Sequence, residues 1–214
     1  LISQYKKISA FSPIIQEYIT GGGYGFFALY NHGEARAVFM HRRLREYPVT
    51  GGPSALAESI YDPMLMEQGL RLLDNLKWHG VAMVEFKKDI LTGRYVLMEI
   101  NPKFWGSLEL AIASGVDFPY LTCRMACEGD IEPVSEYKTG VRFRWPFPQD
   151  LFHAVTNPGA IPQFLSDFAD GTIRSDIDLH DIVPNILQLG MTAGEFALRV
   201  KQGKFWRPHG RPLL

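Results

Sequence analysis

The feature that most constrains this chain is a predicted β-hairpin that carries two carboxylates on one face. Residues 81–86 and 94–100 are apolar segments joined through a Thr-Gly turn. Side chains alternate faces along a strand, so Glu99 and Asn101 project from the same side. Pairing across the hairpin brings Glu85 opposite Glu99, or one residue away from it if the turn contains a bulge. Two carboxylates therefore meet in otherwise apolar strands.

This pair of carboxylates needs a compensating cation. Like charges directly opposite each other in a hairpin are destabilising, and a buried carboxylate without a partner costs several kcal/mol. A lysine such as Lys87 is one candidate. A divalent metal is the other, because carboxylate and amide oxygens are ligands that magnesium takes, and Asn101 has no role beside a lysine. Magnesium also keeps positions open for phosphate oxygens, so the pattern favours a nucleotide site.

The remaining segments predict an α+β fold with antiparallel hairpins and helices packed on them. Residues 26–30 and 35–41 flank Asn31-His32-Gly33-Glu34, a hairpin signal. Asp62-Pro63 starts a helix that Gly80 ends. Further strands are expected at residues 13–19 and 141–145, loops at 20–25 and 47–53, and helices at 107–113, 117–127, 149–156, 162–168 and 192–200.

Composition restricts the class of protein. The hydrophobic content of 46% suits a packed core, and the formal net charge of -1 gives no sign of a nucleic-acid or membrane-surface partner. No apolar run reaches the ~18 residues of a membrane-spanning helix, and no signal peptide opens the sequence. Cys123 and Cys127 lie in an apolar helical pattern and are expected in the core. The absence of a disulfide framework favours a reducing, cytoplasmic compartment.

Several motifs, in this order, resemble the ATP-grasp superfamily of carbamoyl phosphate synthetase, biotin carboxylase and D-alanine–D-alanine ligase. Residues 85–103, a glutamate, a hairpin and then Glu-x-Asn-Pro-Lys, are similar to the magnesium-binding end of that fold. Residues 15–21 resemble its hinge strand for adenine, and residues 24–30 the strand that follows. Residues 41–59 are similar to the basic strand and glycine loop of carboxylate–amine ligases. The resemblance covers roughly residues 10–130.

The resemblance implies a cofactor site for ATP and Mg²⁺, with Mn²⁺ as an alternative ion. Glu85 corresponds to the ligand of one ion, Glu99 to the bridging ligand and Asn101 to the ligand of a second ion. The segment Gln16, Glu17, Tyr18 and Ile19 corresponds to the adenine strand, with the carbonyl of Glu17 and the amide of Ile19 reading the base edge. A plain amphipathic strand is the alternative for that segment.

Two basic residues are implied as catalytic. Lys103 stands where the family commonly has arginine, which directs positive charge at the transferred phosphoryl group; the alternative is a solvated lysine. Arg43 belongs to a basic cluster at residues 41–45 that could hold the acceptor carboxylate or the phosphates, or form a solvated strand end. Alternation places Arg43 and Arg45 on one face and Arg42 on the other. Residues 104–107 are implied beside the substrate pocket, and the alternative for Phe104 and Trp105 is a place in the core.

The implied activity is an ATP-dependent ligase that forms an amide-type bond. A small-molecule carboxylate is activated as an acyl phosphate, and an amine then attacks it. Two alternatives remain open: a non-catalytic nucleotide-binding module, and an interaction domain without nucleotide in which lysines pair with Glu85 and Glu99.

The chain is expected to divide at residue 135. Residues 1–135 would form the C-terminal half of the grasp, with the N-terminal half and the domain before it absent, because the phosphate-binding lysine and glycine loop of the family are not found. Residues 136–214 would be an extension of short helices and a strand that packs against the grasp or forms a subunit contact, such as a homodimer. His180 and the acidic residues 176–181 are either a second metal site or, preferably, a wet loop.

Overall fold

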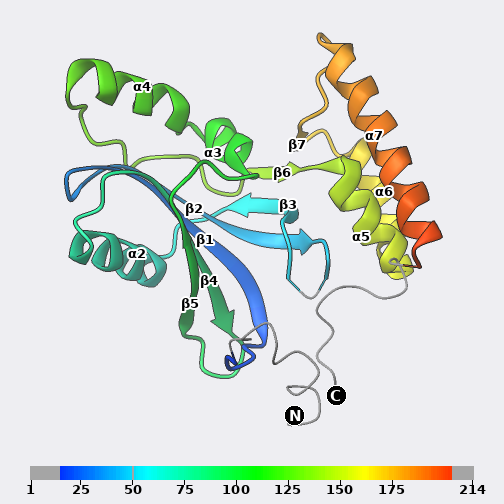
Figure 1. The fold of residues 1–214 in the computed structure, drawn as a ribbon, viewed down its shortest axis with the longest axis horizontal. Helices are drawn as coiled ribbons and strands as arrows, with labels where there is room; N and C mark the ends of the chain where they lie inside the picture. Colours follow the sequence, from blue (N-terminus) through cyan, green and yellow to red (C-terminus); the bar gives the residue numbers. More distant parts are fainter. Residues whose placement is uncertain (1–14, 50, 204–214) are drawn as a thin grey trace.

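The structure is a computed structural model that describes residues 15–49 and 51–203. Its centre is one seven-stranded sheet, ordered β5-β4-β1-β2-β3-β6-β7, with helices on both faces (Figure 1). All neighbouring strands are antiparallel except β6 and β7, which are parallel. The predicted α+β class is confirmed. The strands are β1 (Gly21–Asn31), β2 (Glu34–Glu46), β3 (Ser54–Ser59), β4 (Gly80–Asp89), β5 (Tyr95–Asn101), β6 (Arg142–Arg144) and β7 (Ile173–Ser175).

Six α-helices and two short helical turns complete the described part of the chain. The helices are α2 (Pro63–Asn75), α3 (Leu108–Ser114), α4 (Phe118–Glu128), α5 (Leu151–Thr156), α6 (Ile161–Ala169) and α7 (Ile182–Lys201), and the turns are η2 (Pro146–Asp150) and η3 (Pro158–Ala160). The predicted helices after residues 107 and 117 are therefore confirmed, as are the two short helices after residue 149. Among the described residues, no helix has the length and apolar character needed to cross a bilayer.

The sheet has an apolar core on each face because strand β1 is buried on both sides. Phe26 and Ala28 of β1 point to α2, whereas Phe27 and Leu29 point to α3 and α4. This alternation with a period of two makes β1 a continuous apolar run rather than an alternating one. Met83 of β4 belongs to the core on the face toward α3 and α4. Glu85 lies two residues further along β4 and therefore on the same face, which holds the candidate site.

The glycine-rich segment at residues 20–25 was predicted to be a loop, and this prediction is wrong. Gly21 begins β1, and Gly21 to Gly23 pair with Asp89 to Lys87 of β4. Close neighbours explain the glycines, because a Cβ atom at Gly25 would lie 2.4 Å from the ring of Phe27. The predicted strand at 13–19 is also wrong where it is described, since residues 15–20 have no regular secondary structure. Residues 13 and 14 lie outside the described residues.

The α2 helix begins as predicted but ends earlier. The Asp62 side chain accepts hydrogen bonds from the amides of Met64 (3.0 Å) and Leu65 (3.2 Å), which is the N-cap arrangement. The helix ends at Asn75, and Lys77 then has a positive φ of 47°. Gly80, predicted as the end of the helix, is instead the first residue of β4.

Two elements differ from the prediction because tertiary pairing determines them. Strand β3 was not predicted; it lies between β2 and β6 and completes the sheet there. The last helix, predicted at 192–200, begins ten residues earlier at Ile182. Pro184 lies in its first turn, where proline is tolerated because the amide it lacks would have no partner in the helix.

The C-terminal elements are tied to the sheet by a buried ionic cluster. Arg45 at the end of β2 donates two hydrogen bonds of 2.8 Å to Asp150 and pairs with Asp167 of α6. Arg144 of β6, which is 2% exposed, lies 3.0 Å from Asp150 and 4.1 Å from the ring centre of Phe168. These residues connect the end of β2 to the helices that follow β6. The division at residue 135 stays a prediction.

Helix α4 carries both cysteines on its exposed side. Cys123 and Cys127 are free thiols and exposed, so their predicted place in the core is wrong. The buried residues of this helix are Phe118, Leu121 and Met125. The cysteines belong to the same apolar pattern in the sequence, but their side chains lie beside the stripe formed by these three buried residues and are exposed.

Candidate functional site

The β4–β5 hairpin places Glu85 directly opposite Glu99, as its strand pairing predicts. A register shift follows Glu85 in β4, and Asn101 pairs with Met83 on the same face. The amide nitrogen of Asn101 donates a 2.7 Å hydrogen bond to Glu99 Oε1. This leaves the amide oxygen of Asn101 as a further acceptor beside the two carboxylates.

Arg43 of β2 compensates the charge of this carboxylate pair. Its Nη2 lies 2.6 Å from Glu85 Oε2, and its Nη1 lies 3.7 Å from Glu46 Oε2. The side chains of Arg43 and Glu85 are 12% and 20% exposed. The alternative partner Lys87 does not contact Glu85; its Nζ donates to the carbonyl oxygen of Ile19 at 3.2 Å.

The ion pair forms across an intervening strand. Strand β1 lies between β2 and β4 in the sheet, so a side chain on β1 would block the path from Arg43 to Glu85. Gly23 of β1 leaves that path open, because a Cβ atom there would lie 2.9 Å from Cδ of Arg43. The absence of a side chain at Gly23 therefore gives Arg43 its route to Glu85.

Burial and charge shift the pKa of two residues at the site. Burial raises the pKa of Glu85, Arg43 opposes this rise, and the neighbouring Glu99 adds to it. Burial and the charge of Arg43 lower the pKa of His41 to about 3. His41 is fully buried, and its Nε2 lies 2.9 Å from the hydroxyl of Ser107. It is therefore neutral at physiological pH.

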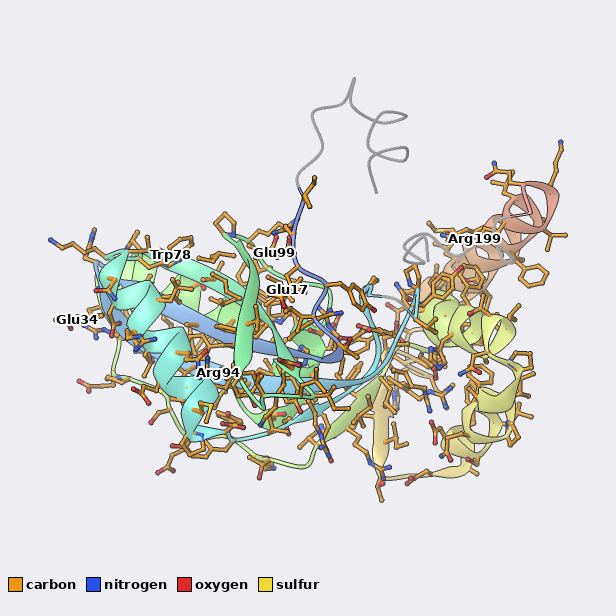
Figure 2. The ribbon with its side chains drawn as sticks, turned by 90° about the horizontal axis from the view of Figure 1, so that it is seen from below. Glu17, Glu34, Trp78, Arg94, Glu99 and Arg199 are labelled. Atoms are coloured by element: carbon orange, nitrogen blue, oxygen red, sulfur yellow. The ribbon has the colours of Figure 1, made fainter. Side chains whose placement is uncertain are left out.

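Glu85 and Glu99 line a cavity of about 730 Å³, within the usual range for small-molecule sites. Six of the residues predicted from the sequence line it: Gln16, Arg43, Glu85, Glu99, Asn101 and Lys103. The structure thus brings both predicted catalytic residues and all three predicted metal ligands to one place. Of the predicted adenine segment, Glu17, Tyr18 and Ile19 lie outside the lining. Figure 2 shows this segment running beside the hairpin that carries Glu99.

Comparison with known families decides which fold this is. A sequence profile described as "ATP-grasp in the biosynthetic pathway with Ter operon" matches residues 12–146. The chain belongs to this ATP-grasp family. No curated protein matches it.

Solved structures agree on the ATP-grasp fold. The chain is similar to a biotin carboxylase–βγ-ATP complex from Campylobacter jejuni, with a TM-score of 0.51 and 16% identity over 66% of this chain and 34% of that chain. It is also similar to the biotin carboxylase domain of a thermophilic 2-oxoglutarate carboxylase bound to bicarbonate, with a TM-score of 0.51 and 14% identity. This match covers 66% of this chain and 35% of that chain. The chain therefore spans about a third of the length of these two proteins.

Sequence reasoning missed part of the cavity of this ATP-grasp chain. Trp145 and Gln149 line it, although residues 136–214 were assigned only to packing or subunit contact. They reach the site because β6 joins the sheet beside β3, a pairing without a local sequence signal. Trp105 and Ser107, by contrast, follow Lys103 in the segment implied beside the substrate pocket, and both line the cavity.

Two tryptophans that line the cavity, Trp105 and Trp145, have buried indole nitrogens. Among the described residues, Nε1 of Trp105 and Nε1 of Trp145 are buried and have no hydrogen-bond partner. Buried donors are nearly always satisfied in native proteins by protein groups, ordered water or a bound ligand. Because both nitrogens are buried, they do not themselves present a donor to the cavity.

The residues at the hairpin fit a magnesium ion. The described part of the chain contains no group of three His, Cys, Asp or Glu side chains that could hold a metal. A site of two carboxylates and one amide oxygen suits magnesium, because this ion takes its other oxygens from water and phosphate. The alternative site at His180 does not form among the described residues: this side chain is 98% exposed, and its ring pairs with a single carboxylate, that of Asp178.

Proposed function

We propose that this ATP-grasp chain is the nucleotide- and magnesium-binding part of an ATP-dependent ligase that joins a carboxylate to an amine. The observation that carries the proposal is the pairing of Glu85 with Glu99 at the wall of a cavity that Arg43 and Lys103 also line. Acidic ligands and basic groups at one wall suit a cation and a polyphosphate together. The family match supports nucleotide chemistry in general.

Glu85, Glu99 and Asn101 would hold magnesium, or manganese in its place. The ion would neutralise charge on the phosphates of ATP as the phosphoryl group is transferred. Glu85 would then be shared between the ion and the guanidinium of Arg43, which contacts the same carboxylate. Arg43, which also lines the cavity, would be the group that meets an anion there.

Arg43 and Lys103 would supply positive charge to the transferred group. Lys103 is exposed at the cavity, and a lysine acts there as a point charge rather than as a bidentate fork. In the proposed reaction a carboxylate oxygen attacks the terminal phosphorus, ADP leaves, and the amine then displaces phosphate from the acyl phosphate. Positioning and electrostatics account for catalysis of this kind, so no side-chain nucleophile is needed.

We assign the adenine ring to the end of the cavity at Gln16. Gln16 is the residue of the predicted adenine segment that lines the cavity. Lys87 holds the segment in place, because its Nζ donates to the carbonyl of Ile19 and lies 5.2 Å from the ring centre of Tyr18. The carbonyl of Glu17 and the amide of Ile19 remain the proposed contacts with the base.

The Arg43–Glu85 ion pair favours one other candidate. Because Arg43 already compensates the charge of Glu85, the carboxylate pair can exist without metal. A metal-free interaction domain with the grasp fold would have the same contacts. Magnesium-dependent ATP binding separates the two candidates, since only the ligase requires it.

Release of ADP tests the proposal. The protein that contains this chain would be offered ATP, magnesium and pairs drawn from amino acids and small carboxylates. The proposal predicts release that needs both a carboxylate and an amine and is lost in Glu99→Gln. Glu58→Gln is the matched control, because Glu58 pairs with Arg42 outside the cavity. Release that persists in Glu99→Gln would refute the assigned metal ligands.

A further inference from the structure

Ser107 is the N-cap residue of helix α3, but its hydroxyl does not cap the helix. A serine at this position usually accepts a hydrogen bond from an amide of the first turn, and among the described residues Ser107 forms no such bond. Its Oγ lies 2.9 Å from Nε2 of His41 instead. Ser107 lines the cavity together with Gly106, where an added Cβ atom would meet no described atom within 4 Å. The hydroxyl is therefore held by His41 at a part of the wall that has room for a ligand.

The surroundings of His41 decide which ring nitrogen carries its proton. His41 is fully buried, and its ring stacks on that of Phe27 with 4.7 Å between the ring centres. Its Nδ1 is buried and has no hydrogen-bond partner among the described residues. In native proteins a buried N–H without an acceptor is rarer than a buried acceptor without a donor, so the proton of the neutral ring belongs on Nε2. This N–H then donates to the oxygen of Ser107, and the hydroxyl hydrogen of Ser107 is left for another acceptor.

The strand register aligns His41 with the two carboxylates of the β4–β5 hairpin. Gly25 of β1 pairs with His41 of β2 on one side and with Glu85 of β4 on the other. Glu85 in turn pairs with Glu99 of β5. Directly paired residues project from the same face of a sheet, and two strand spacings, about 10 Å, separate the backbones of His41 and Glu85. Ser107 therefore meets the cavity over the face where the proposed magnesium ion would lie.

We propose that the Ser107 hydroxyl donates a hydrogen bond to an oxygen of the terminal phosphoryl group of MgATP, and that His41 is the positioning residue that orients this hydroxyl. The inference deepens the proposed function and rests on it. The terminal phosphoryl group is the part of a nucleotide that bound magnesium holds, and the metal ligands share a face with His41. An anion suits the hydroxyl because Arg43 and Lys103 line the same cavity. The hydroxyl adds a donor of fixed direction to these two cations.

Nitrogen-15 NMR of the histidine rings tests the role of His41 without any nucleotide. The protein that contains this chain would be labelled with ¹⁵N-histidine, and the signals of His41 would be assigned by their loss in His41→Gln. The proposal predicts a neutral ring with its proton on Nε2 at neutral pH. A proton on Nδ1 would make Nε2 the acceptor of the hydroxyl hydrogen and would overturn the proposal, because Ser107 could then not donate to a phosphate.

Calorimetric titration of the same protein with MgATP and with MgADP tests the contact itself. Ser107→Ala is expected to weaken MgATP binding about tenfold, as loss of one hydrogen bond to a charged group would. It should leave MgADP binding unchanged, because MgADP lacks the terminal phosphoryl group. Ser107→Thr keeps the hydroxyl and should retain the preference for MgATP. Ser114→Ala is the matched control, since Ser114 also lies in α3 but donates to the carbonyl of Leu110 outside the cavity lining.

Variants of His41 separate positioning from a purely structural role. His41→Leu removes the N–H donor and should reduce the preference for MgATP over MgADP as Ser107→Ala does. His41→Gln keeps an N–H donor and should retain part of that preference. A structural role alone would change both affinities together and would leave their ratio unchanged.

The outcomes distinguish this inference from the proposed function. A wild type that binds neither nucleotide would refute the proposed function and this inference with it. A wild type that binds both, with the same ratio of affinities in Ser107→Ala, would overturn this inference alone. Circular dichroism checks that each variant is folded, and the NMR result on the wild type decides if Ser107→Ala is not.

Discussion

Arg43 reaches across strand β1 to Glu85, with 2.6 Å between Nη2 and Oε2. The contact joins a basic residue of β2 to one of two opposed carboxylates in the β4–β5 hairpin. A guanidinium thus occupies the place next to Glu85 that a magnesium ion would share. Because Arg43 and the proposed magnesium ion share one carboxylate, removing Arg43 should affect stability and metal binding in opposite directions.

Arg43→Met is expected to destabilise the protein by about 2 kcal/mol without metal, because it leaves a half-buried carboxylate pair uncompensated. It should also raise the affinity for Mg²⁺ several-fold, since no guanidinium then competes for Glu85. Urea unfolding in EDTA and in MgCl₂ measures both effects. Arg42→Met is the matched control: Arg42 is more exposed and pairs with Glu58, so a loss below about 1 kcal/mol is expected. Equal losses in the two variants would contradict the account.

As the pH decreases, magnesium affinity should begin to fall at a higher pH than it would at a site of ordinary carboxylates. Burial raises the pKa of Glu85 above its usual range, and a protonated carboxyl is a poor ligand, so protons compete with the ion as the pH drops. Arg43→Met removes the group that opposes the rise in pKa and should move the midpoint to still higher pH. Calorimetric titrations with MgCl₂ between about pH 7.5 and pH 5 measure the midpoints. An unchanged or lower midpoint in Arg43→Met would argue against this role for Arg43.

Folding stability should decrease with acidification because of His41. Burial holds its pKa at about 3 in the folded protein, whereas the unfolded chain takes up the proton near pH 6.5. The unfolded state therefore binds more protons between these values, and stability present above pH 6.5 is lost as the pH falls. The loss from this residue between pH 7 and pH 5 is about 2 kcal/mol. Urea unfolding of wild type and His41→Gln measures it, and an identical pH dependence would contradict the assignment.

Two helical glycines should respond oppositely to alanine. A Cβ atom at Gly69 in α2 would lie 2.3 Å from the ring of Phe26, whereas one at Gly190 in α7 meets nothing within 4 Å. Gly69→Ala is expected to destabilise the protein by about 1–3 kcal/mol through overpacking. Gly190→Ala should stabilise the helix by up to about 1 kcal/mol. Thermal unfolding of dilute protein compares the stability of the two variants with that of the wild type. A change of the same sign in both would show that packing at Gly69 does not decide the effect.

The carboxylate pairing could be predicted from the sequence because hairpin contacts are local. Glu85 and Glu99 lie on consecutive strands, so alternation and the turn fix their relation. Arg43 could not be paired with Glu85 in this way. Their contact depends on β1 lying between β2 and β4 and on Gly23 having no side chain. Such non-local order has no short-range signal.

The errors in element boundaries have similar causes. Residues 20–25 read as a loop because glycine weakens isolated strands, yet close neighbours such as Phe27 demand glycine there. The first half of α7 was missed because its apolar residues face outward and Pro184 interrupts the helical pattern. In β1, tertiary contacts outweighed the low strand propensity of glycine. In α7, the exposed apolar side chains did not follow the usual pattern of a surface helix.

The most direct test of the central claim is calorimetric measurement of ATP binding with and without magnesium. Wild type, Glu99→Gln and the control Glu128→Gln would be compared, since Glu128 is exposed on α4 and pairs with Arg124. The account predicts binding that requires magnesium, is weakened at least tenfold in Glu99→Gln and is unchanged in Glu128→Gln. Binding of equal strength in wild type and Glu99→Gln, or no magnesium dependence, would contradict the assignment of the Glu85–Glu99 pair as the metal site.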